Sequence, residues 1–309
     1  MRTFAITSLA LAALLVPCGG AGSAAPATTK QRPQPRIVTP GPLALTRDGR
    51  ALVVADRDLR RLVRIDLRTR RRTVVAAGFP EAPVGLAQHH SGRLFASSAE
   101  RIYRIAGSRK VVIAGTGRRS HTGDGGPATA ATFGGIVGID VDFDGNLVVA
   151  EYDNWIRVVD AAGRIRTVAG NGSTGYAGDG GGALDAALGH PHDVIWRHDG
   201  VILIADSHNG VVRQVAADGT ISTFASGYAA PVAMEPGPRA TVYVADAGRR
   251  AVYRLSSDGR TRRLIARAST PIGLAVDDRG NVYVSELEGR KRVLRVSPAG
   301  RVTVLAVGA

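Results

Sequence analysis

The feature that most limits the fold is a repeated unit of two short alternating segments joined by a turn that contains glycine. The clearest copy runs from Pro271 to Glu286, and its second segment ends in that acidic residue. Further copies stand at residues 41–56, 84–98, 137–151, 191–206 and 231–246. Apolar and polar residues that alternate over several positions predict β-strands, so each copy is expected to supply a hairpin.

Each unit continues into a third segment that holds an arginine, then a polar turn and a fourth short segment. The six second strands are closed by Asp56, Ser98, Glu151, Asp206, Asp246 and Glu286, at spacings of 42, 53, 55, 40 and 40 residues. Repeated units of four strands and roughly 40–45 residues are typical of β-propellers. The sequence therefore predicts an all-β fold, a single six-bladed β-propeller of four-stranded blades.

The two long spacings contain one insertion used twice, at residues 115–131 and 170–187, each built around Gly-Asp-Gly-Gly. Both insertions connect blades, so we expect them on the face where the first strands begin, here called the top face. The loops between second and third strands share that face, and long loops on a rigid scaffold are where function usually lies. Asp124, Asp179 and Tyr176 in the insertions are therefore candidate binding residues.

Three sequence features carry a family resemblance: the Ala-Asp pairs that end strands, the loop Asp-Ser-His-Asn-Gly at 206–210 and the repeated insertion. With these, the chain resembles the NHL-repeat family of six-bladed propellers, in particular its secreted bacterial members, over about residues 36–309. Propellers include both binding modules and enzymes, so the resemblance leaves both open. We favour a module that binds a ligand or a protein through the top-face loops. The alternative is a propeller enzyme, a lyase or a lactonase-like hydrolase, with a metal near His192.

Blade 4 holds the residues best suited to a binding or metal site on the top face. They are His190, His192, Asp193, Asp206 and His208. Two imidazoles and a carboxylate suit zinc, and the metal set would be His190, His192 and Asp206.

The other blades argue against a metal site shared between blades. Propeller lyases that resemble this chain take histidines from several blades, whereas the positions here that match His192 are Val84, Val137, Val232 and Ile272. We therefore expect a largely apolar channel mouth and no catalytic residue that the sequence alone identifies. No cofactor is required by this interpretation, and zinc or calcium are the alternatives.

Two further patterns are interpreted as structural. Residues 140–151 fit the calcium-loop pattern of EF-hands, but residues 146–150 form a predicted strand that would carry Glu151 ~16 Å from Gly145. The acids that close the second strands recur together with the arginines of the third segments. We expect ion pairs within each blade, such as Asp246 with Arg254.

The first residues have the plan of a secretory signal peptide: Arg2, an apolar run from Phe4 to Val16, and then small residues. Thirteen apolar residues are too few to cross a bilayer core of ~30 Å as a helix. We assign residues 1–27 to the signal peptide, 28–36 to a flexible tether and 37–309 to the propeller. The alternative is a lipoprotein signal that ends before Cys18, with a lipid on Cys18 as a membrane tether. Either way we expect an extracytoplasmic protein, secreted or attached to the cell envelope.

The charge balance is strongly basic, with 40 Lys and Arg against 26 Asp and Glu and a net charge of +14. Export removes nucleic acid from the expected partners, which leaves a protein or an anionic envelope polymer. The single cysteine excludes a disulfide scaffold and a cysteine-based zinc site. We expect the protein to be a monomer.

Overall fold

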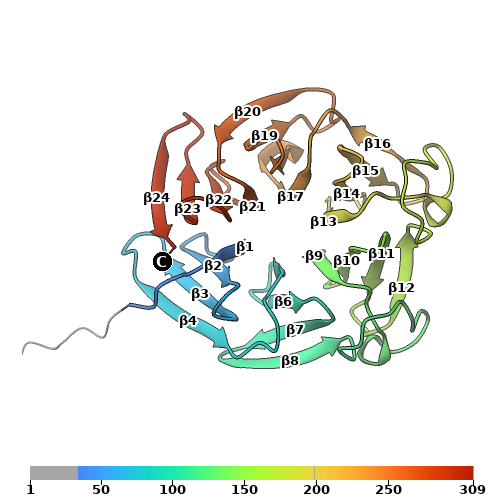
Figure 1. The fold of residues 1–309 in the computed structure, drawn as a ribbon, viewed down its shortest axis with the longest axis horizontal. Coiled ribbons are helices and arrows are strands. Elements are labelled where there is room, and N and C mark those ends of the chain that lie inside the picture. The colour runs from blue at the N-terminus through green and yellow to red at the C-terminus, as the bar shows by residue number, and fades with distance from the viewer. Residues whose placement is uncertain (1–33, 198, 309) are drawn as a thin grey trace, which may run out of the picture. The chain divides into compact units, whose positions relative to one another are not determined.

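Six four-stranded antiparallel sheets form a ring in the computed structural model, which describes residues 34–197 and 199–308 (Figure 1). The predicted all-β, six-bladed propeller is confirmed. Within the described ranges no helix is long and apolar enough to cross a membrane. The predicted signal peptide, Cys18 and most of the predicted tether lie outside the described residues.

Each blade is a continuous stretch of chain. Blade 1 contains β1 (Pro40–Leu45), β2 (Ala51–Asp56), β3 (Arg61–Asp66) and β4 (Arg72–Ala77), and blade 2 contains β5 (Gly85–Gln88), β6 (Leu94–Ser98), β7 (Arg101–Ala106) and β8 (Arg109–Ala114). Blade 3 contains β9 (Ile136–Val141), β10 (Leu147–Glu151), β11 (Trp155–Val159) and β12 (Ile165–Ala169), and blade 4 contains β13 (Pro191–Trp196), β14 (Ile202–Asp206), β15 (Val211–Val215) and β16 (Ile221–Ala225). Blade 5 contains β17 (Pro231–Pro236), β18 (Val242–Asp246), β19 (Ala251–Leu255) and β20 (Arg262–Arg267), and blade 6 contains β21 (Pro271–Val276), β22 (Val282–Glu286), β23 (Arg292–Val296) and β24 (Val302–Val307). Short 3₁₀ turns stand at Ala128–Ala130, Ala183–Asp185 and Pro238–Ala240.

The second strand of every blade is buried along its whole length. Its Val, Ile, Leu and Ala side chains alternate between the two faces of the sheet and contact both neighbouring blades. One apolar cluster, for example, joins Val148 of β10 to Val194 of β13 and Ile221 of β16. The hydrophobic core is thus a ring of clusters between adjacent blades.

In five of the six blades an acid closes the second strand and holds the chain where it enters that blade. Asp206 and Glu151 have no exposed surface and accept hydrogen bonds of 2.6 Å from the backbone N–H of Gly189 and Gly134, respectively. The predicted pair of Asp246 with Arg254 is wrong. Arg254 is exposed, and the nearest cation to Asp246 is Arg249, with Nε 3.5 Å from Oδ2.

The reason for that error is a difference of one residue between blades. Arg157 and Arg213 occupy the third position of their strands, whereas Arg254 occupies the fourth position of β19. Side chains alternate along a strand, so a shift of one residue turns the arginine to the opposite face of the sheet. In blade 6 the acid Glu286 instead pairs with the first residue of β23, Arg292, at 2.6 Å.

The ring closes between blades 6 and 1 without exchange of a strand. Ile37, which precedes β1, is fully buried in the same apolar cluster as Leu43 of blade 1 and Ala306 of blade 6. The Ser285 hydroxyl of blade 6 donates a 2.6 Å hydrogen bond to the carbonyl of Gly41. Packing between two complete blades therefore seals the ring.

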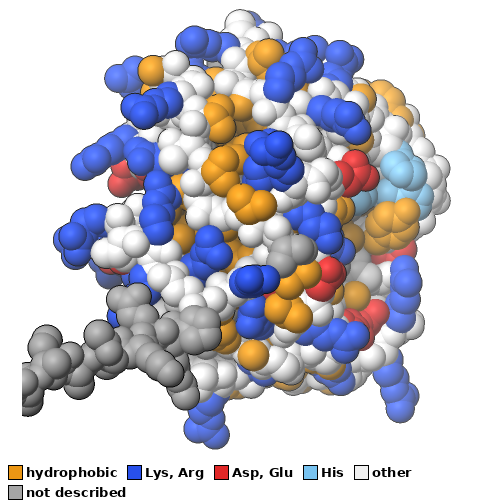
Figure 2. Space-filling view, turned by 60° about the vertical axis from the view of Figure 1, so that its left-hand side comes forward, with side chains coloured by type: hydrophobic (Ala, Val, Ile, Leu, Met, Phe, Trp, Pro, Cys, Tyr) orange, Lys and Arg blue, Asp and Glu red, His pale blue; other side chains and the backbone are white. Residues whose placement is uncertain are grey.

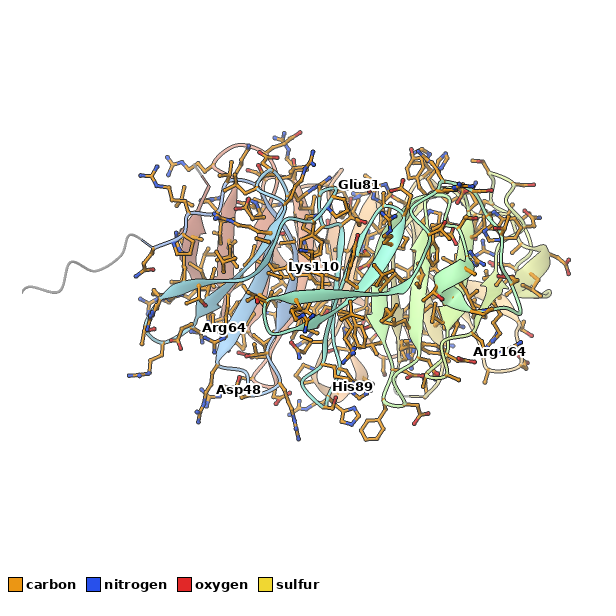
Figure 3. All side chains as sticks on the ribbon, turned by 90° about the horizontal axis from the view of Figure 1, so that it is seen from below. Asp48, Arg64, Glu81, His89, Lys110 and Arg164 are labelled. Atoms are coloured by element: carbon orange, nitrogen blue, oxygen red, sulfur yellow. The ribbon has the colours of Figure 1, made fainter. Side chains whose placement is uncertain are left out.

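The two insertions lie at the outer rim, and their predicted place on the top face is corrected. Sheet twist turns the fourth strand of a blade until it runs around the ring, as β8, near the label of Lys110, does in Figure 3. The first insertion donates from Gly125 N to the Ile165 carbonyl at 2.8 Å, and the second from Gly180 N to the Ile221 carbonyl at 2.8 Å. Each insertion thus covers the outer edge of the blade that follows it, β12 or β16.

Candidate functional site

The top end of the central channel has an apolar mouth. Val84, Val137, Val232 and Ile272 line it together with His192, as the repeat alignment predicts. The cavity there has a volume of about 60 Å³. This holds a few water molecules, whereas sites for drug-sized ligands enclose roughly 300–1,000 Å³. A ligand therefore meets the mouth from outside the channel.

Beside this mouth lies a group of aromatic rings that we call the His–Tyr platform: Tyr152, His190, His192 and His208. The ring of His190 stacks on Tyr152 with centroids 4.5 Å apart and meets His208 edge-on at 4.4 Å. His192 lies edge-on to Tyr152 at 6.1 Å. The structure thus brings together the three histidines singled out in the sequence, and it adds Tyr152.

Backbone geometry fixes the orientation of His190 in the platform, and burial sets the charge state of His192. His190 has a positive φ of 48°, and its N–H donates to Asn154 Oδ1 at 2.8 Å. Its Nδ1 lies 2.9 Å from the Tyr152 carbonyl, which fixes the ring plane. Burial, reinforced by the neighbouring His208 and His190, lowers the pKa of His192. The His192 side chain is therefore neutral at pH 7.

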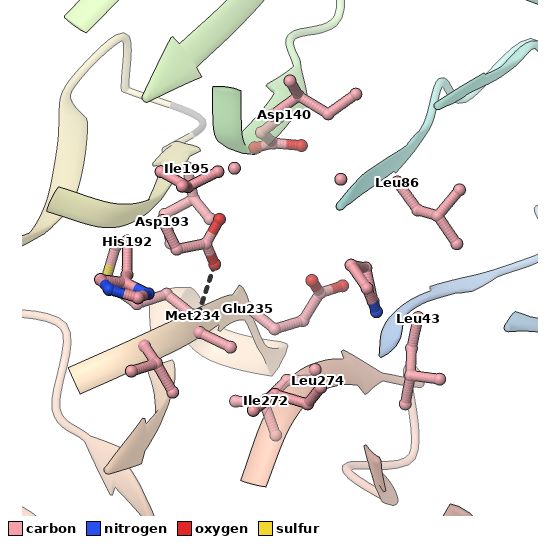
Figure 4. A pocket seen from close by; sticks show the side chains of 18 of the residues that line it. Leu43, Leu86, Asp140, His192, Asp193, Ile195, Met234, Glu235, Ile272 and Leu274 are labelled. Carbon is pink, nitrogen blue, oxygen red and sulfur yellow. Dashed lines mark hydrogen bonds between the residues drawn. The ribbon is translucent and has the colours of Figure 1, made fainter. Parts of the chain in front are cut away.

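The two carboxylates expected beside these histidines point elsewhere. Asp206 accepts hydrogen bonds from Gly189 N at 2.6 Å and Asn209 Nδ2 at 2.8 Å inside the blade. Asp193 points into the channel, where it accepts from Met234 N at 2.7 Å (Figure 4). Among the described residues no group of three or more His, Cys, Asp or Glu is arranged to hold a metal ion. The structure therefore assembles a ring platform but no metal donor set from His190, His192 and Asp206.

The candidate residues of the insertions bind the next blade. Asp179 Oδ1 lies 2.6 Å from Nη2 of the buried Arg213, and its Oδ2 accepts from the Thr223 hydroxyl at 2.6 Å. The Tyr176 hydroxyl lies 2.6 Å from the same Thr223 oxygen. These contacts place Asp179 and Tyr176 at the rim, away from the channel mouth.

Asp124 repeats this arrangement one blade earlier, with Oδ1 2.6 Å from Arg157 Nη2. Partial burial alone would raise the pKa of Asp124, but hydrogen bonds from Thr167 and Arg157 outweigh it and lower the pKa. Asp124 is therefore a carboxylate at pH 7. The sequence contained the signal for both pairs, because the two blades that follow an insertion are those with arginine at the third position of the third strand.

The residues that fit the calcium-loop pattern do not converge. Asp142 Oδ1 accepts from the backbone of Gly145 and Asn146 within the turn, at 2.8 Å each. Asp140 turns into the channel, and its Oδ2 accepts from Trp196 N at 2.8 Å. Glu151 stands at the far end of β10. This agrees with the structural interpretation of the motif.

Three carboxylates line the channel: Asp140, Asp193 and Glu235, from blades 3, 4 and 5. Asp193 was expected on the top face, and the cluster of the three was not predicted from the sequence. Figure 4 shows them pointing toward a common space. Burial raises the pKa of Asp140 to about 6 and of Asp193 to about 7. Burial, and then repulsion by Asp140 and Asp193, raises the pKa of Glu235 well above its ordinary value. At neutral pH the three carboxyl groups of the channel are therefore partly protonated and partly ionised.

A second and larger cavity opens at the bottom end of the channel, opposite the top face, beside the turns between first and second strands. Its volume is about 700 Å³, and Asp140 and Glu235 contribute to its lining together with Trp196 and Phe143. His90 stacks on Phe143 with centroids 3.9 Å apart. Figure 3 shows His89, which precedes His90, on this lower face, opposite Glu81.

Comparison with known proteins supports the fold. No known protein family matches the sequence, and no curated protein matches it. Among solved structures, streptogramin B lyase aligns at 12% identity over 88% of this chain and 84% of its own, with a TM-score of 0.61. The shared feature is the six-bladed β-propeller.

Other propellers are similar to the same degree. A chain of the nidogen/laminin complex aligns at 14% identity over 82% of this chain and 91% of its own, with a TM-score of 0.65. A protein proposed to be a gluconolactonase aligns at 10% identity over 88% of this chain and 91% of its own, with a TM-score of 0.63. Identities this low show a common fold, and the propellers concerned include both a lyase and a member of a protein complex.

Proposed function

We propose that the protein is an extracytoplasmic propeller of the NHL type that binds a protein ligand through its top face. The observation that carries this proposal is the His–Tyr platform beside an apolar channel mouth. Tyr152 is 38% exposed, and His208 is exposed as well. Aromatic side chains that sit on a rigid scaffold are favoured at the centres of protein interfaces.

The surroundings of the platform indicate which kind of ligand it binds. The carboxylates of Asp193 and Asp206 are bonded to backbone N–H groups, and His192 is neutral, so the platform itself offers ring faces and apolar edges. The narrow cavity admits at most part of one side chain from outside. A peptide segment with an aromatic or aliphatic side chain at its centre fits this surface.

The alternative is a propeller enzyme of the lyase or lactonase type, and one observation favours it. Asp193, with a pKa of about 7, and the neutral His192 line the same cavity. Groups that titrate near the working pH are suited to general acid–base catalysis. Streptogramin B lyase, an enzyme by its name, has the same fold, and one propeller fold can carry either binding or catalysis.

Selection from a displayed library of random peptides tests the binding function. The full-length chain is immobilised, and the enriched peptides are synthesised and titrated by calorimetry. We expect micromolar binding that the double variant Tyr152→Ala, His208→Ala loses. The control is Val111→Ala on β8, which replaces a side chain that is 40% exposed on the rim of blade 2.

Two results would count against the binding module. One is the absence of any enriched peptide, and the other is binding that the platform variant and the control retain equally. Peptide that is consumed in the presence of the wild type, but not of Asp193→Asn, would favour the enzyme instead.

A further inference from the structure

The excess positive charge of the propeller is confined to three neighbouring blades. Blades 5, 6 and 1, with residues 226–308 and 34–77, contain 25 Lys and Arg against 11 Asp and Glu. Blades 2 to 4, with residues 78–225, contain 12 against 15. We call the first set the basic half. One side of the ring therefore carries a net charge of +14 and the other −3.

The rim of the basic half also exposes aliphatic side chains. Val302, Val304 and Val307 of β24 are 51%, 46% and 52% exposed, and Leu264 of β20 and Val74 of β4 are each 45% exposed. In blades 3 and 4 the insertions cover the corresponding outer strands. Figure 2 brings the side that carries β24 and β4 forward and shows Lys and Arg side chains interspersed with apolar ones.

The chain enters the propeller through this same side. The Gln34 side chain accepts a 3.1 Å hydrogen bond from the backbone of Arg72, at the start of β4. The 33 residues before it include the apolar run from Phe4 to Val16. A membrane attachment through that segment would tether the propeller at Gln34, on the side of the basic half.

We propose that the rim of the basic half is a docking surface for an anionic lipid bilayer. Arginines near such a surface are attracted to the headgroups, and the exposed valines enter the boundary between headgroups and acyl chains. A single polyanionic chain would be held by charge alone and would leave the aliphatic row in water. The surface is distinct from the His–Tyr platform, so this proposal does not depend on the proposed function.

Two sets of four exposed arginines test the proposal. The rim variant replaces arginines whose side chains donate no hydrogen bond within the described structure: Arg71→Gln, Arg254→Gln, Arg263→Gln and Arg301→Gln. The matched control removes the same charge from blades 2 to 4: Arg104→Gln, Arg109→Gln, Arg118→Gln and Arg166→Gln. Both are made in the full-length chain, so the N-terminal segment and the net charge are identical in the two proteins.

Flotation with vesicles of phosphatidylglycerol and phosphatidylcholine measures the binding. We expect the rim variant to partition to the vesicles at least about tenfold more weakly than the wild type. The partitioning of the control should differ from that of the wild type by less than about threefold. Wild-type binding should fall steeply between about 0.1 and 0.5 M salt. Val302→Ser with Val304→Ser should weaken binding further at high salt, whereas Val111→Ser with Val112→Ser on β8 should not.

Equal partitioning of the rim variant and the control would overturn the proposal, because the position of the arginines on the propeller would then have no effect on membrane binding. Tight binding of the wild type to polyphosphate without binding to the vesicles would overturn it as well and indicate a polymer partner. Loss of vesicle binding with retained peptide binding at the platform would separate this surface from the proposed function.

Discussion

The guanidinium of Arg213, which has no exposed surface, lies 2.6 Å from a carboxylate oxygen of Asp179 on the insertion that precedes its blade. A second carboxylate, that of Asp206, lies 3.7 Å from the same guanidinium. One buried cation thus joins the outer insertion to the strand that ends beside the top face. The insertion is fixed to the propeller by this contact.

Removal of the insertion's carboxylate should therefore destabilise the fold. We expect Asp179→Ala to lower the free energy of unfolding by about 2–4 kcal/mol, because the one carboxylate left to the buried Arg213 is that of Asp206, 3.7 Å away. Urea denaturation measures the change. Asp185→Ala, in the same insertion but exposed, should cost less than about 0.5 kcal/mol. Equal effects of the two substitutions would show that the ion pair does not hold the insertion.

Asp246 and Arg254 should behave as independent residues. Asp246→Ala removes the acceptor for the N–H groups of Ala229 and Ala230, both at 3.0 Å, and should cost about 1–3 kcal/mol. Arg254→Ala should cost about 0.5 kcal/mol or less, because the side chain is exposed. A double-mutant cycle should give an interaction energy near zero. Coupling above about 1 kcal/mol would contradict the geometry.

The channel carboxylates make stability depend on pH. An unfolded Asp has a pKa of about 3.9, whereas that of folded Asp193 is about 7, so the folded chain holds this proton more tightly. Stability from this group is therefore complete near pH 4 and is lost as the pH rises through 7. Asp193→Asn should be more stable than the wild type by about 1–3 kcal/mol at pH 8, with no such gain at pH 4. Asp144→Asn, on an exposed turn, is the control for denaturation across this range.

The seam between blades 6 and 1 should depend on Ile37. Ile37→Ala removes a fully buried side chain from the cluster between the two blades and should cost about 2–4 kcal/mol. Val38→Ala, at the next and only partly buried position, should cost less. Thermal unfolding measures both, and a loss below about 1 kcal/mol for Ile37→Ala would place the closure elsewhere.

The blades could be predicted from the sequence because the signal recurs at fixed positions. An acid such as Asp206 or Glu286 ends a second strand in five of the six blades, and the alternation before it defines the hairpin. The apolar mouth followed directly from the same alignment. The position of the two insertions could not be predicted in this way. It depends on the twist of the fourth strand, and the spacing of residues along the chain carries no information about that twist.

The meeting of the three carboxylates in the channel was missed for a different reason. Asp193 stands at the third position of its strand, whereas Asp140 and Glu235 stand at the fifth, so no alignment of the repeats brings them together. Gly138 adds a second requirement: a Cβ on it would lie 2.5 Å from Asp193 Oδ1. Side chains from three blades meet there only because the ring makes their first strands converge.

Because the ring is closed by packing between complete blades, the chain termini could be moved to another junction between blades. Each sheet is built from an uninterrupted stretch of chain, and the seam beside Ile37 is held by packing and by the bond from Ser285 to Gly41. A circular permutant that joined the present ends and opened between blades 4 and 5 would keep all six sheets. The fold therefore depends on the order of the blades around the ring and not on which blade comes first in the chain.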